Sequence, residues 1–206
     1  MTGMEHGSWR GRVGPVTQWD ESAAHQFKVL TGHAGVRGED HVADIGCGCL
    51  RVGRLLIPYL EPGRYFGVDP DHELVSAGVM HETGPGLVSL RMARFTNRAD
   101  FNISEEWPQI TWDVLYAHDL IPHLIDDPTR QQFFEQVSYS SGRNTQTWIT
   151  FTSADEDALI EFAGRRTVEL TASTLRSEAD TAGLKLVVQS KIRHPAGQTW
   201  AVLSRR

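Results

Sequence analysis

Two glycines separate a short apolar run from an amphipathic one in the stretch VADIGCGCLRVGRLL, which begins at Val42. Gly46 and Gly48 lack a β-carbon, so the backbone can turn sharply there and a ligand can approach it closely. A helix that starts after this turn points its free N–H groups and its positive end into the same space. The spacing therefore predicts a binding turn between a buried strand and a helix.

Two carboxylates accompany this turn. Asp44 ends the first apolar run, and Asp69 ends the next one, RYFGVDP, 21 residues beyond Gly48. A carboxylate at the end of the second strand can accept hydrogen bonds from both hydroxyl groups of a ribose. The alternative role for Asp69 is to cap the following helix, because DPDHEL has the character of a capping sequence. Together, the turn and the acid predict a ligand that contains a nucleoside.

The third position of the glycine pattern separates two cofactor classes. Nicotinamide-binding chains use G-x-G-x-x-G, in which the third glycine lets the helix pack closely. Arg51 stands at that position, which argues against a dinucleotide. Asp44 favours a cationic ligand near the turn. S-adenosylmethionine carries a sulfonium and an ammonium group and has no phosphates, so the residues favour this cofactor.

Strand-like and helix-like segments alternate from residue 42 to about residue 150, which predicts a mostly parallel sheet with helices on both faces. The last two strand-like runs, LKLVVQSKI and TWAVLSRR, are separated only by RHPAGQ. A crossover helix needs a longer connection, so these two strands should pair antiparallel. The residues therefore predict a doubly wound α/β fold whose last strand is antiparallel.

Length and composition indicate one domain over residues 1–206, because 40% hydrophobic residues suit a single core. The Gly-rich start lacks periodicity, and we expect residues 1–25 to form an arm or lid. Residues 153–170 are expected to form a helical insertion near the substrate site. Both segments are candidates for choosing the substrate.

The charge pattern argues against several partners. The net charge is −6 and the basic residues are scattered, so we expect no nucleic acid; no apolar run is long enough to span a membrane. Cys47 and Cys49 are too close for a disulfide and, without a second Cys pair, make a poor zinc site. We therefore expect no metal and a cytoplasmic protein that acts on a small molecule as a monomer or homodimer.

The motifs resemble those of class I S-adenosylmethionine-dependent methyltransferases, in particular a bacterial small-molecule type. VADIGCG is similar to the family's first motif, Asp/Glu-x-Gly-x-Gly, and YFGVDPDHEL to its ribose-binding motif. HPAGQTWAVL resembles the terminal hairpin of the bacterial subset. The resemblance covers about residues 20–206 and implies a Rossmann-like, seven-stranded sheet. The chain departs from many members at Leu50, where they carry a further glycine.

The resemblance also implies a set of cofactor contacts, which follow from the positions that match the family's motifs. It implies Asp44, Gly46, Cys47 and Gly48 around the methionine part of the cofactor, Asp69 and Pro70 at the ribose, Asp100 with the Phe101 backbone at the adenine, and His118 near the end of the fourth strand.

Three polar residues lie at or just after the end of the fourth strand-like run, WDVLYAHDL, on the side where a methyl acceptor would lie. His118, Asp119 and His123 are the catalytic candidates, because an imidazole can remove a proton from a hydroxyl or amine near neutral pH. The alternative for either histidine is a hydrogen-bonded core residue. A base is needed only if the acceptor must lose a proton, since the sulfonium already makes the methyl group electrophilic.

We therefore expect methyl transfer from S-adenosylmethionine to an oxygen or nitrogen of a small molecule. One alternative is transfer or cyclisation of the cofactor's aminocarboxypropyl group, because the sulfonium activates three carbons. Another is a module that binds the cofactor without turnover. The product distinguishes the two reactions: S-adenosylhomocysteine marks methyl transfer, and methylthioadenosine marks the other route.

Overall fold

The computed structural model describes residues 9–162 and 164–206. Its centre is a seven-stranded sheet with the order β3-β2-β1-β4-β5-β9-β8. Strand β9 is antiparallel to both neighbours and the other pairs are parallel, which confirms the expected fold class. The strands are β1 (Val42–Ile45), β2 (Tyr65–Val68), β3 (Arg94–Thr96), β4 (Val114–Ala117), β5 (Gln146–Phe151), β8 (Leu184–Val188) and β9 (Thr199–Arg205).

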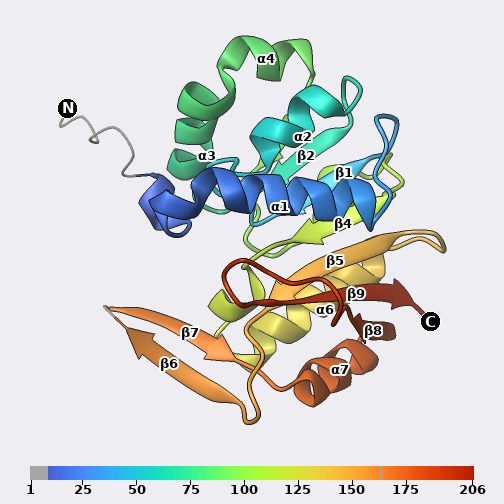
Figure 1. Ribbon diagram of the computed structural model, residues 1–206. Helices are drawn as coiled ribbons and strands as arrows, with labels where there is room; N and C mark the ends of the chain where they lie inside the picture. The colour runs from blue at the N-terminus through green and yellow to red at the C-terminus, as the bar shows by residue number, and fades with distance from the viewer. Residues whose placement is uncertain (1–8, 163) are drawn as a thin grey trace.

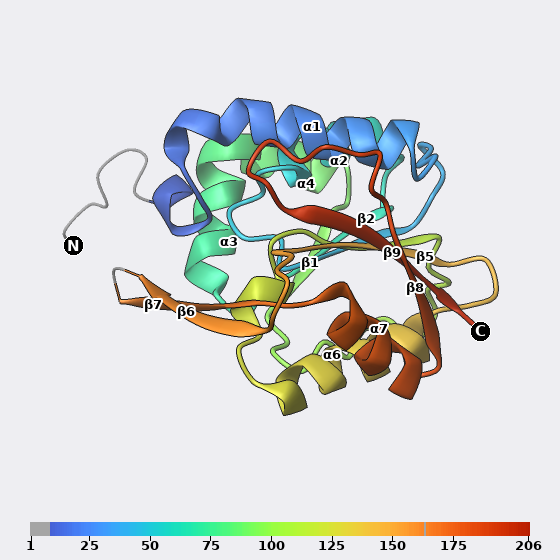
Figure 2. The same ribbon diagram turned by 60° about the horizontal axis from the view of Figure 1, so that its bottom comes forward.

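Helices cover both faces of this sheet. The first four lie on one side and α6 and α7 on the other, in both views (Figure 1, Figure 2). Within the described ranges, no helix is long and apolar enough to cross a bilayer. The helices are α1 (Trp19–Gly32), α2 (Gly53–Tyr59), α3 (His72–Gly78), α4 (Pro85–Leu90), α5 (Ile103–Glu106), α6 (Asp127–Ser140) and α7 (Ala172–Thr181).

The side chains of β1 alternate between two apolar layers. Val42 packs in the layer that contains α1 and α2, whereas Ala43 and Ile45 pack in the layer that contains α6 and α7. All four residues of β1 are buried, so the strand contributes to both layers. Asp44 is its polar exception. This residue lies near the carboxyl end of the strand, where ligands of parallel α/β sheets bind.

The expectation of a helix in residues 153–170 is wrong. This segment contains the antiparallel hairpin of β6 (Ala158–Phe162) and β7 (Arg165–Glu169). Its β-branched and aromatic side chains favour an extended chain. Gly164, at φ 75°, lies in the turn between the strands, in the left-handed region that glycine enters without strain. The hairpin extends away from the main sheet (Figure 1).

The N-terminal segment is packed against the core in its described part. Residues 1–8 of the expected arm lie outside the described residues. Two short 3-10 turns follow, η1 (Arg10–Arg12) and η2 (Val16–Gln18), and α1 then starts inside the expected segment. Trp9 is 5% exposed and packs with Trp19 and Cys49. Residues 9–18 therefore cover the glycine turn.

Candidate functional site

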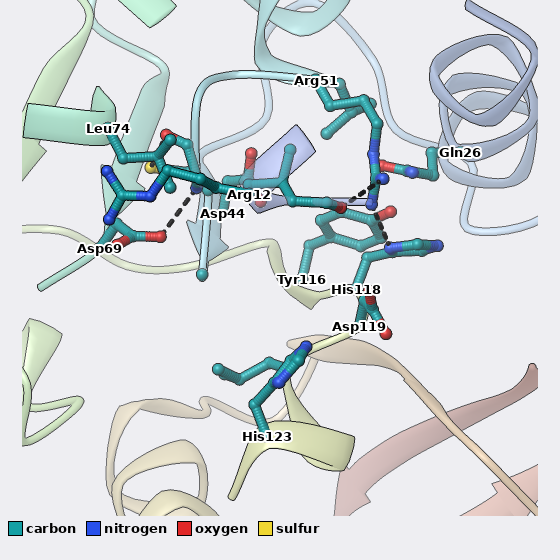
Figure 3. Close-up of a pocket in the computed structure, with 16 residues that line it drawn as sticks. Arg12, Gln26, Asp44, Arg51, Asp69, Leu74, Tyr116, His118, Asp119 and His123 are labelled. Carbon is teal, nitrogen blue, oxygen red and sulfur yellow. Dashed lines mark hydrogen bonds between the residues drawn. The ribbon is translucent and has the colours of Figure 1, made fainter. Parts of the chain in front are cut away.

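A cavity of about 230 Å³ opens at the carboxyl ends of β1, β2 and β4. The N-terminal segment and α1 close one side of it, and the short turn η4 (Ile121–His123) borders the other (Figure 3). Most of the residues predicted from the sequence line this cavity. The lining consists of Arg12, Val13, Gln26, Asp44, Gly46, Cys47, Gly48, Arg51, Val52, Asp69, Leu74, Tyr116, His118, Asp119, Leu120 and His123.

The glycine turn has the backbone conformation that its sequence predicts. Gly46 and Gly48 adopt φ values of 80° and 54°, which side chains rarely tolerate. A β-carbon on Gly48 would lie 2.7 Å from Cγ1 of Val13. Leu50 also adopts a positive φ, 64°, and its side chain is fully buried. Core packing therefore holds Leu50 in the left-handed region without the glycine that many family members carry.

Asp44 is a buried carboxylate beside the cavity. Its side chain is 2% exposed and accepts a hydrogen bond of 2.7 Å from the Tyr65 hydroxyl. Burial raises the pKa of Asp44 to about 7. A cation bound in the cavity would stabilise the ionised form and lower this pKa, so Asp44 is suited to an ammonium or sulfonium ligand.

Asp69 joins the glycine turn to the start of α3. One carboxylate oxygen accepts from the Gly48 N–H at 2.8 Å, and the other accepts from the Asp71 N–H at 2.9 Å. The side chain of Asp71 caps α3 by accepting from the Leu74 N–H, so the capping role belongs to Asp71. Each oxygen of Asp69 keeps a second lone pair for a ligand hydroxyl. Burial raises the pKa of Asp69.

Arg51, which stands at the third position of the glycine pattern, supplies a cation to the cavity. Its Nη1 donates to the Val13 carbonyl at 2.9 Å, and its Nη2 lies 3.1 Å from His118 Nδ1. Gln26 Nε2 and Tyr116 Oη are buried cavity-lining atoms that have no hydrogen-bond partner among the described residues. Buried polar groups normally find a partner, so these atoms mark places where a polar ligand fits.

The three catalytic candidates differ in their freedom to act. His118 Nδ1 faces Arg51, and its Nε2 lies 2.7 Å from His194 Nε2. Burial and the neighbouring Arg51 hold the pKa of His118 well below its usual value. Asp119 accepts from the Gln198 amide. His123 lines the cavity, and its ring forms no hydrogen bond with any described residue. Of the three side chains, that of His123 is therefore the one left open to a ligand in the cavity.

Three predicted cofactor residues lie outside this cavity: Pro70, Asp100 and Phe101. Asp100 is paired with Arg98 at 2.7 Å, which lowers the pKa of this carboxyl to about 2. Phe101 is 7% exposed and contacts Phe133 in the core. The three also do not line a neighbouring cavity of about 580 Å³, which shares Asp69 with the first and is bordered by Phe95 and Asn97.

Several cavity residues were missed in the sequence. Arg12 and Val13 lie in an aperiodic segment, and Gln26 lies on α1 without a motif around it. Among the missed residues, Arg51 alone had a signal in the sequence. A charged residue stands there, beside the turn, where the pattern G-x-G-x-x-G has its third glycine. Among the described residues, no group of three or more His, Cys, Asp or Glu side chains is arranged to hold a metal ion.

No family model matches the chain, and no curated protein matches its sequence. Solved structures match its fold. The glycopeptide N-methyltransferase MtfA is 9% identical, with a TM-score of 0.70 over 90% of this chain and 97% of its own. DhpI in complex with SAH is 16% identical, with a TM-score of 0.67 over 97% of this chain and 91% of its own.

A third match is the CcbJ methyltransferase from Streptomyces caelestis, which is 13% identical with a TM-score of 0.67. The match covers 97% of this chain and 100% of that chain. These similarities extend over nearly the whole length of both partners, and the strand order with an antiparallel β9 agrees with them. The chain therefore has the fold of class I S-adenosylmethionine-dependent methyltransferases.

Proposed function

We propose that the protein transfers the methyl group of S-adenosylmethionine to an oxygen or nitrogen atom of a small molecule. The observation that carries this proposal is the joint placement of Asp44, Asp69 and Arg51 around one cavity at the glycine turn. The cofactor has a cationic centre, a ribose and a carboxylate, and each of these groups finds a matching residue there. Solved structures of MtfA with S-adenosyl-L-methionine and with sinefungin have the same fold.

The residues present fit this cofactor. Asp69 would accept from the ribose hydroxyls with its free lone pairs, and Arg51 would hold the carboxylate. Asp44 would stabilise the cationic end. The unpartnered Gln26 amide and Tyr116 hydroxyl offer further hydrogen bonds to the polar methionine part. The neighbouring cavity, which shares Asp69, offers the adenine a place between α3 and the end of β3.

When bound, S-adenosylmethionine supplies a methyl group that its sulfonium makes electrophilic. The protein's task is then to hold the acceptor in line with this group and to exclude water, which lowers the barrier by several kcal/mol. Val13, Val52 and Leu120 give the cavity apolar walls. His123 would accept the proton that a hydroxyl or amine acceptor loses.

The test combines binding with product analysis. Titration calorimetry with S-adenosylhomocysteine should show one binding site, and NAD⁺ should not bind. Incubation with S-adenosylmethionine and a panel of phenols, amines and carboxylic acids should give a methylated product and S-adenosylhomocysteine by mass spectrometry. Release of methylthioadenosine would instead support aminocarboxypropyl transfer. Absence of binding to either cofactor form would contradict the proposal.

Location and assembly belong to the same proposal. A cytoplasmic enzyme that works as a monomer or homodimer remains our prediction. We further propose that the hairpin of β6 and β7 borders the acceptor, because β7 packs against η4, which carries His123. Arg165 on this hairpin donates to the Gly11 carbonyl at 3.3 Å, so the hairpin also contacts the N-terminal segment that lines the cavity with Arg12 and Val13.

A further inference from the structure

Two histidines connect the cavity to the loop between β8 and β9. The Ala196 N–H donates to His194 Nδ1 at 3.1 Å. The Nε2 atoms of His194 and His118 are 2.7 Å apart, and His118 Nδ1 lies 3.1 Å from Arg51 Nη2. In both views this loop runs close to α1 (Figure 1, Figure 2). The four groups form one row of contacts from the loop backbone to the cavity wall.

The N–H groups of these four residues cannot satisfy all three contacts in the row. Both ends, the Ala196 N–H and the Arg51 guanidinium, can only donate. Burial and neighbouring charges lower the pKa of His118 well below its usual value and that of His194 to about 4, so both rings are neutral at pH 7. Two neutral rings carry one N–H each. Both Nδ1 atoms must accept, and the contact between the two Nε2 atoms holds one proton. All three contacts are therefore satisfied only if the two rings share a single proton. Since the neutral rings carry two, one contact always brings two donors together.

The other neighbours of the pair do not resolve this mismatch. The Trp200 ring packs against both histidines, with centroids 5.6 Å from His118 and 5.9 Å from His194. Its Nε1–H donates to His25 Nε2 at 3.2 Å, so it neither donates to the pair nor accepts from it. Protonating either ring would add a further donor. Within the described residues, no acceptor lies between Arg51 and His118.

An anion that bridges Arg51 and His118 from the cavity side satisfies every group at once. His194 Nδ1 then accepts from Ala196, and its Nε2–H donates to His118 Nε2. His118 carries its proton on Nδ1 and donates it to the anion, beside the Nη2 of Arg51. Both donors belong to residues that line the cavity, so a ligand can reach them. Figure 3 shows the His118 ring and the Arg51 guanidinium facing each other at the cavity wall.

We propose that His118 and Arg51 together bind the carboxylate of the cofactor, and that His194 is a positioning residue that holds His118 in its Nδ1–H form. The identification of the anion as the cofactor's carboxylate rests on the proposed function. The donor pair itself does not, because it follows from the contacts of the free protein. Cofactor binding is thereby linked to the turn that Ala196 forms in the loop between β8 and β9.

Substitutions separate this role from a general effect on folding. His194→Ala should weaken S-adenosylhomocysteine binding about tenfold, since a hydrogen bond to a charged group is lost or misaligned. The analogue without the carboxylate, 5′-(3-aminopropylthio)adenosine, should lose less than twofold. His118→Asn keeps an N–H near the Nδ1 position, so it should retain most of the affinity. In that background, His194→Ala should have no further effect.

Nitrogen-15 NMR of the histidine rings gives the direct readout. With S-adenosylhomocysteine bound, the account predicts His118 protonated on Nδ1 and His194 protonated on Nε2. A His118 ring protonated on Nε2 in that complex would overturn the inference while leaving the proposed function intact. If S-adenosylhomocysteine does not bind, the proposed function fails. An acetate titration then tests the donor pair alone, and a His118 ring protonated on Nε2 at saturating acetate overturns it.

Discussion

The two sides of the cavity are built differently. The side where we propose that the methyl donor binds, here called the donor side, is formed by Asp44, Gly46, Gly48, Arg51 and Asp69. It consists of strand ends and a turn tied by hydrogen bonds such as the 2.8 Å contact from the Gly48 N–H to Asp69. On the side where we propose that the acceptor binds, here called the acceptor side, η4 carries the exposed His123 and packs against the β6–β7 hairpin. Backbone geometry thus fixes the donor side, and exposed side chains form the acceptor side.

The two sides also differ in how deeply their side chains are buried. Leu159 is 51% exposed and Phe162 is 80% exposed, whereas every residue of β1 and β2 is buried. A change on the donor side should therefore alter both stability and cofactor affinity. A change on the acceptor side should alter turnover and leave cofactor affinity unchanged. The following predictions test this separation.

His123→Ala should cause the largest loss, on turnover alone. With an acceptor that must lose a proton, kcat should fall about 100-fold or more, because a positioned base contributes that much. Calorimetry should find the affinity for S-adenosylhomocysteine within twofold of wild type. His33→Ala, which changes an exposed histidine beyond α1, is the control and should change neither value. An unchanged kcat in the His123 variant would remove this residue from the mechanism.

Asp44→Asn should weaken S-adenosylhomocysteine binding by about 100-fold, because the ligand's ammonium loses a buried ionic partner. Wild-type affinity should also fall as pH drops below about 7, since Asp44 then becomes protonated. The variant should lack this pH dependence. Calorimetry between pH 5.5 and 8.5 measures both effects, and parallel pH profiles in the two proteins would refute the assignment.

The same variant should have the opposite effect on stability. The pKa of Asp44 rises from 3.8 to about 7 on folding, so the native state binds the extra proton between these values. The free energy of unfolding therefore falls as pH rises through this window, by up to about 4 kcal/mol. Asp44→Asn should be the more stable protein above pH 7 in urea unfolding. Lower stability of the variant at pH 8 would show that the ionised carboxylate is not destabilising.

Asp69→Ala should weaken cofactor binding tenfold or more, because the ribose hydroxyls lose their acceptor and about 1.4 kcal/mol suffices for that change. Asp100→Ala is the matched comparison, since Asp100 is paired with Arg98 outside the cavity. Its affinity should stay within twofold of wild type. A tenfold loss in the Asp100 variant would support the family-implied adenine contact over the geometry described above.

Gly48→Ala should have the smallest effect on binding but a measurable one on stability. Its β-carbon would lie 2.7 Å from Val13, and its φ of 54° disfavours a side chain. Gly63→Ala is the control: it has a φ of 80° but no atom within 4 Å of the added carbon. The control should lose about 1 kcal/mol from backbone strain alone, and Gly48→Ala should lose more. Equal losses of stability in the two variants would mean that the Val13 side chain moves away from the added carbon at no cost.

The glycine turn and the position of Asp69 beside it could be predicted from the sequence because their signals are local. An apolar run, two glycines and Asp69 lie within one stretch of the chain, and the short link between the last two strands required them to be antiparallel. The partners of Arg51 could not be predicted in this way. His118 is 67 residues away from it, and His194 is 76 residues further along the chain, so only the fold brings them together.

The hairpin of residues 153–170 shows where local patterns mislead. Apolar residues cluster in ALIEF without a clear period of either 2 or 3.6, and a short cluster of this kind fits a helix or a strand. The adenine contact of Asp100 stays a prediction, because its pairing with Arg98 does not test it.

The decisive experiment is a crystal structure of the protein with S-adenosylhomocysteine. We expect the ligand to lie across the carboxyl ends of β1 and β2. Its ribose hydroxyls should donate to Asp69, and its carboxylate should lie between Arg51 and His118. A ligand bound elsewhere on the protein, or a ribose without contact to Asp69, would contradict the account.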